Sequence, residues 1–306
     1  MSERQVEIVE VGPRDGLQNE SAVVSTEDKL AFIGRALEAG LRRIEVASFV
    51  HPGRVPQMAD AEAVVNGLPD IKNAVYIGLV LNLKGLERVL ATRPRGRGID
   101  EVGAVAVSTD TFGEKNQGQT RLESIEISNQ IVRQARAEGL SANVTISASF
   151  GCPFEGEVAI ENVVEMALRL AESEPHELAI ADTIGVAVPN QVSEVFERVA
   201  EVVPHIPLRG HFHNTRNTGI ANSWAAYQAG AVTLDASLGG LGGCPFAPRA
   251  TGNIGTEDLV YMLSRSGVHT GVDLEKLIET AGWLEGVLGG ATPAMVSKAG
   301  GFPAGR

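Results

Sequence analysis

Residues 6–49 read VEIVEVGPRDGLQNESAVVSTEDKLAFIGRALEAGLRRIEVASF and contain one complete strand–helix–strand unit. A β-branched run at 6–11 leads through a polar turn into an amphipathic segment at 27–39, and a second β-branched run follows at 43–49. Gly40 comes directly after the amphipathic segment, where a helix commonly ends on a residue with left-handed backbone angles. This order predicts a right-handed βαβ unit in a parallel sheet.

The same alternation continues along the chain. The further predicted strands are 74–81, 101–108, 142–150, 177–182, 208–213 and 232–238, and a second clear helix covers 120–138, before Gly139. Eight strand–helix units are the number that closes a (β/α)8 barrel, or TIM barrel, whose usual size is about 250 residues. An open doubly wound sheet is the alternative, but no G-x-G-x-x-G follows the first strand.

We therefore predict an α/β fold, a TIM barrel, in one domain over residues 1–306. The barrel is expected over about 6–270 and short extra C-terminal helices over about 272–290. The Gly-, Ala- and Pro-rich end that follows is expected to be loose.

The net charge and the composition limit the kinds of partner that the protein is expected to bind. The 306 residues hold 26 Lys and Arg against 38 Asp and Glu, a formal net charge of −12, which argues against nucleic-acid and anionic-membrane surfaces. One or two local arginines would still hold a small anionic substrate. Two cysteines, Cys152 and Cys244, make no disulfide framework. With a polar amino terminus and no apolar run of about 18 residues, a cytoplasmic protein is expected.

Polar side chains gather where the predicted strands end, which is where barrels of this kind carry their functional residues. They are Arg14, Asp15, Glu45, Asp182, Thr183, His211 and His213, with Asn253 after the last strand.

The two histidines indicate a metal site. Side chains two apart on a strand point to the same face, so His211 and His213 enter the barrel mouth together. Asp15 and Asn253 are candidates for the third and fourth ligands, a set that suits Mg²⁺ or Mn²⁺ without excluding Zn²⁺. Alternatively, one histidine caps the helix after the seventh strand and the other packs in the core.

The remaining polar residues each have a structural alternative. Arg14 and Asp15 form either a surface ion pair or, with the guanidinium in the mouth, a site for an enolate or a carboxylate. Glu45, in an apolar strand, needs a partner such as Arg14 in either case. Asp182 either faces the substrate or caps the next helix, and Asp235 is interpreted as structural.

The glycine-rich run at 239–243 could cradle a phosphate or act as a flexible lid. Cys244 follows it and is a plausible proton donor or redox-sensitive gate beside a metal, although a buried inert cysteine is the commoner role.

Several segments resemble 3-hydroxy-3-methylglutaryl-CoA (HMG-CoA) lyase, a metal-dependent TIM-barrel family related to isopropylmalate and homocitrate synthases. They are VEVGPRDGLQNE at 9–20, IEVASFV at 44–50, GCPFEG at 151–156, DTIG at 182–185, HFH at 211–213, GGLGGCPFA at 239–247 and TGNIGTEDLVYML at 251–263. They run in order along nearly the whole chain.

The resemblance implies retro-Claisen cleavage of an acyl-CoA to acetyl-CoA and acetoacetate, hence leucine degradation or ketone-body formation, by a protein that is often a homodimer. It implies a divalent metal on Asp15, His211, His213 and Asn253, and substrate contacts from Arg14, Gln18, Asp182 and Thr183. Arg14 would stabilise the enolate, Glu45 would position Arg14, and Cys244 would lie on the lid. Asp15, His211 and Cys244 are the candidate proton carriers.

Four positions depart from the family's pattern, and one of them is Asp110, where a glutamate is expected. Asn214 replaces an aspartate after the second histidine, Arg216 adds a cation expected near the mouth, and Ser21 stands where a lysine that contacts CoA is usual. These departures leave open another 3-hydroxy-3-substituted acyl-CoA as substrate. Two further hypotheses are an acetyl-CoA-dependent 2-oxo acid synthase and a barrel that binds acyl-CoA without turnover.

Overall fold

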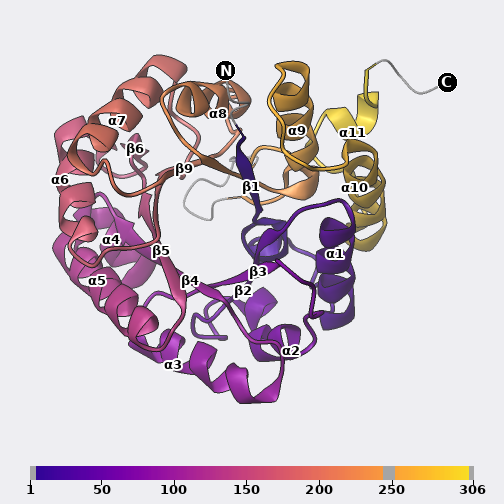
Figure 1. Cartoon of the computed structure of the whole chain (residues 1–306), viewed down its shortest axis with the longest axis horizontal. Coiled ribbons are helices and arrows are strands. Elements are labelled where there is room, and N and C mark those ends of the chain that lie inside the picture. Colours follow the sequence, from indigo (N-terminus) through magenta and orange to yellow (C-terminus); the bar gives the residue numbers. More distant parts are fainter. Residues whose placement is uncertain (1–4, 244–251, 303–306) are drawn as a thin grey trace.

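The computed structural model describes residues 5–243 and 252–302 and shows a closed barrel of eight parallel strands (Figure 1). Around the barrel the strand order is β1-β10-β9-β8-β5-β4-β3-β2. The barrel strands are β1 (Glu7–Glu10), β2 (Arg43–Ser48), β3 (Val75–Leu79), β4 (Glu101–Val107), β5 (Ser141–Ser147), β8 (Glu177–Asp182), β9 (Leu208–Phe212) and β10 (Thr233–Ala236). The predicted TIM barrel is confirmed.

Helices form a ring outside the strands, as Figure 1 shows. They are α1 (Thr26–Glu38), α2 (Ala61–Asn66), α3 (Leu83–Thr92), α4 (Asp110–Gln117), α5 (Arg121–Ala137), α6 (Ile160–Ala171), α7 (Pro189–Val202), α8 (Gly219–Gln228), α9 (Thr256–Arg265), α10 (Leu274–Leu288) and α11 (Val296–Ala299). No helix in the described part of the chain is long and apolar enough to cross a membrane.

Local sequence signals explain where α1 begins and ends. The Ser25 hydroxyl accepts the backbone N–H of Asp28 at 3.1 Å and caps the first turn. At the other end Gly40 takes a φ of 100°, a backbone conformation that disfavours any residue with a side chain. Phe32 and Ile33 lie on the buried face between these ends, so the helix packs its apolar stripe on the barrel.

The predicted strand at 142–150 is too long at its carboxyl end. β5 ends at Ser147 because Ala148 adopts a left-handed φ of 57°, which turns the chain out of the sheet. The turn leads into a small hairpin of β6 (Gly151–Cys152) and β7 (Gly156–Glu157).

The expectation of a loose carboxyl-terminal end is wrong for residues 292–296. The Thr292 side chain is buried and its backbone N–H donates to Glu285 at 2.9 Å, while the N–H of Ala294 donates to the carbonyl of Gly239 at 3.0 Å. The N–H of Val296 donates to Asp258 at 2.7 Å. This segment is therefore fastened to the loop at the barrel mouth, a tertiary contact that composition alone does not show.

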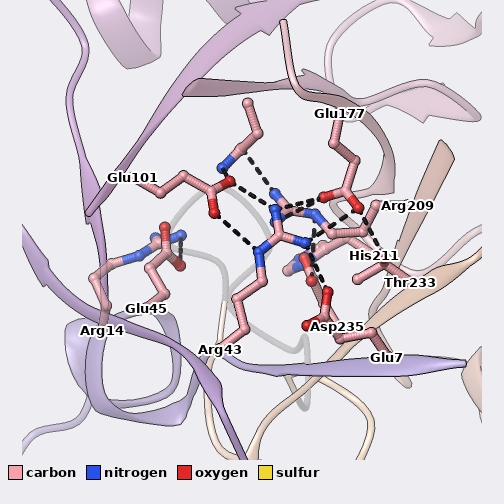
Figure 2. Close-up of polar contacts among 11 residues, drawn as sticks. Glu7, Arg14, Arg43, Glu45, Glu101, Glu177, Arg209, His211, Thr233 and Asp235 are labelled. Carbon is pink, nitrogen blue, oxygen red and sulfur yellow. Dashed lines mark hydrogen bonds and ion pairs between the residues drawn. The ribbon is translucent and has the colours of Figure 1, made fainter. Parts of the chain in front are cut away.

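A layer of buried ions crosses the inside of the barrel (Figure 2). The Arg43 guanidinium donates to both oxygens of Glu101, at 2.6 and 2.9 Å, and to both oxygens of Glu177, at 2.9 and 3.2 Å. All three side chains are buried, and Asn143 donates to Glu101 at 2.6 Å. The barrel interior is thus closed by a satisfied ionic network below the mouth.

Replacing Arg43 with methionine should lower the free energy of unfolding by about 3–5 kcal/mol, because two buried carboxylates lose their shared cation. Chemical denaturation measures this loss. Arg198→Met is the matched control, since the Arg198 side chain is 43% exposed and lies 4.0 Å from its nearest carboxylate. An equal effect of both substitutions would contradict the assignment of a structural role to the ionic layer.

Candidate active site

A cavity of about 890 Å³ opens where the barrel strands end. Its lining includes most of the residues that the sequence singled out, which come from the segment after β1 and from β2, β8 and β9. They are Arg14, Asp15, Gln18, Glu45, Thr183, His211 and His213. The polar residues predicted at separate strand ends therefore share one cavity.

Asp15, His211 and His213 form a cluster in which one ligand atom of each lies within 4.8 Å of the others. Nε2 of His213 lies 4.0 Å from Oδ2 of Asp15, and the two imidazole centroids are 5.2 Å apart. Nδ1 of His213 is buried and has no hydrogen-bond partner in the described structure. A carboxylate and two imidazoles that converge in this way fit a divalent cation.

The electrostatics of the cluster also suit a cation. Burial raises the pKa of Asp15, but the charges of Arg14 and the two histidines outweigh it and hold that pKa well below its usual range. Burial, with the neighbouring His211, lowers the pKa of His213 to about 4. At neutral pH the cluster therefore presents an ionised carboxylate and a neutral imidazole, the forms that bind metals.

His211 is oriented by a carboxylate that the sequence analysis interpreted as structural. Its Nδ1 lies 3.0 Å from Oδ2 of Asp235, which leaves Nε2 for the cluster. Burial lowers the pKa of His211, but the hydrogen bond and charge of Asp235 outweigh it and raise that pKa overall. Asp235 also lines the cavity.

Arg209 is a second cavity residue that the sequence analysis missed. Its Nη2 donates to Asn143 at 2.9 Å, and its Nε lies 3.4 Å from Asp235 (Figure 2). Arg209 precedes His211 by two residues on β9, so strand periodicity predicts that both enter the barrel. The two-residue spacing that places His211 and His213 on one face therefore also predicts Arg209.

Arg14 is held between two carboxylates. Its guanidinium lies 2.6 Å from Asp15 and 2.5 Å from Glu45, and Figure 2 shows the pair with Glu45 beside the ionic layer. The Arg14 side chain is only 12% exposed. The interpretation as a surface ion pair is therefore wrong, because the guanidinium is nearly buried and fixed by two partners at the cavity wall.

Asn253 lies beside the cluster, but its amide nitrogen faces Asp15. Nδ2 donates to Oδ2 of Asp15 at 2.8 Å and to the carbonyl of Leu241 at 3.1 Å. An isolated β-bridge joins residue 253 to His213. The structure thus brings Asn253 to the site as a donor that positions Asp15.

Asp182 and Thr183, at the end of β8, make different contacts. Both oxygens of Asp182 accept backbone N–H groups, from Val186 and Ala187 at 2.9 Å each, and this residue does not line the cavity. The geometry favours the alternative in which Asp182 organises the turn before α7. Thr183 lines the cavity and bonds Ser147 at 2.9 Å.

Most of the glycine-rich run at 239–243 is packed rather than free. The N–H of Gly239 donates to Glu257 at 3.1 Å, and residues 239–242 are buried. A Cβ on Gly242 would lie 2.6 Å from Nδ2 of Asn253, so glycine permits this close approach. Residues 239–242 are therefore packed against their neighbours, whereas Gly243 lines the cavity, and Cys244 lies outside the described residues.

The four departures from the family pattern are not among the residues that line the cavity. Arg216 donates to the carbonyls of Ile184 and Gly185 at 3.1 and 2.8 Å. It does not line the cavity, so the expectation of an extra cation near the mouth is wrong. Oδ1 of Asn214 accepts the N–H of Gly219 at the start of α8, at 3.1 Å. Ser21 is exposed outside the lining.

Glu10 joins the two loops that carry the site. Its Oε1 accepts the N–H groups of Gly12, at 2.8 Å, and Leu238, at 2.9 Å, and its Oε2 accepts the Thr256 hydroxyl at 2.6 Å. Burial raises the pKa of Glu10 to about 7, against the opposing effect of these hydrogen bonds. The Arg14–Asp15 segment and the glycine-rich run are thus fastened to one titratable carboxyl.

This carboxyl makes stability depend on pH. Glu10 binds its proton more tightly in the folded chain, so its contribution to stability is lost as the pH rises from 4.5 through about 7. Glu10→Gln cannot ionise and keeps an acceptor oxygen. The free energy of unfolding of Glu10→Gln, taken relative to that of wild type, should be higher at pH 8 than at pH 5 by on the order of 2 kcal/mol. Denaturant unfolding measures this gain, with the exposed Glu27→Gln as control, and an equal effect at both pH values would contradict the prediction.

The comparisons with known proteins cover nearly the whole chain. The family model described as HMGL-like matches residues 5–283. An (R)-citramalyl-CoA lyase of Chloroflexus aurantiacus is 41% identical over 305 residues, which cover 96% of this chain and 95% of that protein. A hydroxymethylglutaryl-CoA lyase of Bacillus subtilis is 41% identical over 291 residues, covering 95% and 96%.

Solved structures agree with these relatives. The HMG-CoA lyase of Bacillus subtilis superposes with a TM-score of 0.91 at 40% identity and covers 98% of this chain and 99% of that one. An HMG-CoA lyase of Acinetobacter baumannii, in complex with coenzyme A and 3-methylmalate, gives a TM-score of 0.92 at 38% identity and covers 100% and 98%.

Proposed function

Because the chain belongs to the HMGL-like family, we propose that it is a metal-dependent carbon–carbon lyase that cleaves HMG-CoA to acetyl-CoA and acetoacetate. One observation carries the proposal. Arg14, fixed by Glu45, lies beside the cluster of Asp15, His211 and His213 in a single cavity. The cluster suits a cation, and the guanidinium suits an anion that forms next to it.

We propose Mg²⁺ or Mn²⁺ on Asp15, His211 and His213, with Asn253 as the fourth ligand. Asn253 would bind through its amide oxygen, so its side-chain amide would have to turn around from the arrangement in which Nδ2 faces Asp15. Both cations favour oxygen ligands and accept imidazole. When bound, the metal would lower the pKa of the substrate's tertiary hydroxyl and fix its orientation.

Arg14 is proposed to stabilise the enolate. When the C2–C3 bond of the acyl group breaks, its electron pair stays on the acetyl fragment, and the thioester oxygen gains negative charge. A guanidinium that Glu45 already holds in place needs no reorganisation to meet this charge. Glu45 would act through Arg14 as a positioning residue, and Gln18 and Thr183, which line the same cavity, would contact the substrate.

Three groups are proposed to carry protons: Asp15, His211 and Cys244. His211 would carry its proton on Nδ1, which lies 3.0 Å from Oδ2 of Asp235, because its Nε2 faces the metal cluster. Arg14 and the histidines hold the pKa of Asp15 low, so its carboxylate is ionised at neutral pH and accepts a proton only as a weak base.

The relative that cleaves (R)-citramalyl-CoA supports a second candidate, the same chemistry on a different acyl group. Parallel incubations with HMG-CoA and (R)-citramalyl-CoA separate the two, since cleavage gives acetoacetate from the first and pyruvate from the second. A kcat/KM at least tenfold higher for HMG-CoA supports the main proposal. A kcat/KM at least tenfold higher for (R)-citramalyl-CoA would identify that thioester as the substrate instead. Release of free CoA from acetyl-CoA and a 2-oxo acid would indicate a synthase.

The wider context remains part of the proposal. Acetoacetate as product fits leucine degradation or ketone-body formation in the cytoplasm. We also propose a homodimer, which light scattering in solution tests directly.

A further inference from the structure

The cavity reaches from the metal cluster to a rim formed by the loop after β2. Its volume of about 890 Å³ lies near the upper end of the range for small-molecule sites, which is more than the six-carbon 3-hydroxy-3-methylglutaryl group fills. His51, Arg54, Val55 and Pro56 line this rim. Val23, from the loop before α1, lines it too, with its side chain 81% exposed.

Arg54 differs from the other arginines that line the cavity. Arg14 is paired with Glu45 and Asp15, and Arg209 lies 3.4 Å from both Glu177 and Asp235. Arg54 is exposed, and within residues 5–243 and 252–302 it makes no ion pair. Its charge is therefore available to a ligand, in a chain whose net charge of −12 otherwise repels anions.

The rim loop is fixed rather than free. The backbone N–H of Arg54 donates to the carbonyl of His51 at 2.8 Å, and the N–H of Gly53 donates to Nδ1 of His51 at 3.1 Å. Nε2 of His51 is thus left to act as a donor. Gln57, further along the loop, accepts the N–H of Val24 at 3.1 Å and donates to the carbonyl of Ala22 at 3.0 Å. These bonds tie the arginine loop to the segment that carries Val23.

We propose that Arg54, with His51 on the same turn, binds a phosphate group of the CoA moiety of the substrate. The inference rests on the proposed function, because its ligand is an acyl-CoA. The acyl carboxylate belongs at the metal end of the cavity, so the phosphates are the anions that remain for the rim. A guanidinium donates forked hydrogen bonds that suit phosphate oxygens, and exposed Val23 offers the pantetheine arm an apolar contact at the rim.

Direct binding of CoA, dephospho-CoA and pantetheine, measured by calorimetry on wild type and Arg54→Gln, tests the proposal. The substitution should weaken CoA binding about tenfold and leave pantetheine binding unchanged. In the lyase assay KM should rise about tenfold, with kcat within twofold of wild type. Arg133→Gln, which removes an exposed charge from α5, is the matched control and should change neither quantity.

If Arg54→Gln weakens the binding of CoA alone, Arg54 contacts the 3′-phosphate. If it weakens the binding of both CoA and dephospho-CoA, Arg54 contacts the diphosphate. CoA binding within twofold of wild type, or an equal loss for pantetheine, would overturn the proposal. Because binding is measured without turnover, Arg54-dependent CoA binding by a protein that cleaves no thioester would contradict the proposed function and leave this inference standing.

Discussion

Replacing His213 with alanine is expected to reduce turnover of HMG-CoA by about 10³- to 10⁴-fold. His213 contributes to the cluster with Asp15 and His211, its Nε2 lying 4.0 Å from Oδ2 of Asp15, and the loss of one of three converging ligands removes most of the affinity for the metal. Metal-assisted polarisation contributes several kcal/mol to such reactions, and each 1.4 kcal/mol is a factor of ten. Steady-state kinetics at saturating Mn²⁺ measure the effect, and calorimetric titration with Mn²⁺ measures the lost affinity.

His205→Ala is the matched control, since His205 is exposed and lies outside the cavity. It should keep full activity and metal affinity. The unfolding midpoint of His213→Ala should stay close to that of wild type, because the substituted side chain has no hydrogen-bond partner on Nδ1 to lose. A His213→Ala protein that binds Mn²⁺ and turns over as wild type does would show that the cluster is not the metal site.

The Arg14→Met substitution is expected to lower kcat by about 10³-fold while metal affinity stays within a few-fold of wild type. The guanidinium meets charge that develops in the transition state, and the loss of a preorganised donor of this kind costs about 10²- to 10³-fold. The substitution also leaves the Glu45 carboxylate without the guanidinium that lies 2.5 Å from it. An unpaired carboxylate in the cavity wall disturbs that wall and lowers kcat further. Arg14→Lys keeps the charge but not the fork and should recover about tenfold.

Glu45→Gln separates a positioning role from a direct one. If Glu45 acts through Arg14, the double variant Arg14→Met/Glu45→Gln should be little worse than Arg14→Met alone, a non-additive result. Fully multiplicative losses in the double variant would assign Glu45 an independent contact with substrate. A kcat for Arg14→Met within tenfold of wild type would remove Arg14 from the chemistry.

The barrel could be predicted because its signals are local. Alternating β-branched runs and capped amphipathic segments such as 27–39 specify strands and helices within a few residues, and eight repeats allow one closed architecture. The error at 142–150 arose from Ala148, since a left-handed φ at a non-glycine residue leaves no mark in the sequence.

The site could be predicted as a set of residues, but not as a set of contacts. Strand ends placed Asp15, His211 and His213 together without any structural information. The contacts of two other carboxylates could not be predicted, because their roles depend on neighbours that the sequence does not reveal. Asp235 reaches His211 across adjacent strands, and Asp182 turns onto backbone amides of its own loop.

The most direct measurement is the release of acetyl-CoA and acetoacetate from HMG-CoA with Mg²⁺ or Mn²⁺, repeated after chelation and after the metal is restored. The account predicts equimolar products, loss of release on chelation, and recovery when the metal returns. Release that is unaffected by chelation, or no release from a folded protein that binds Mn²⁺, would contradict it.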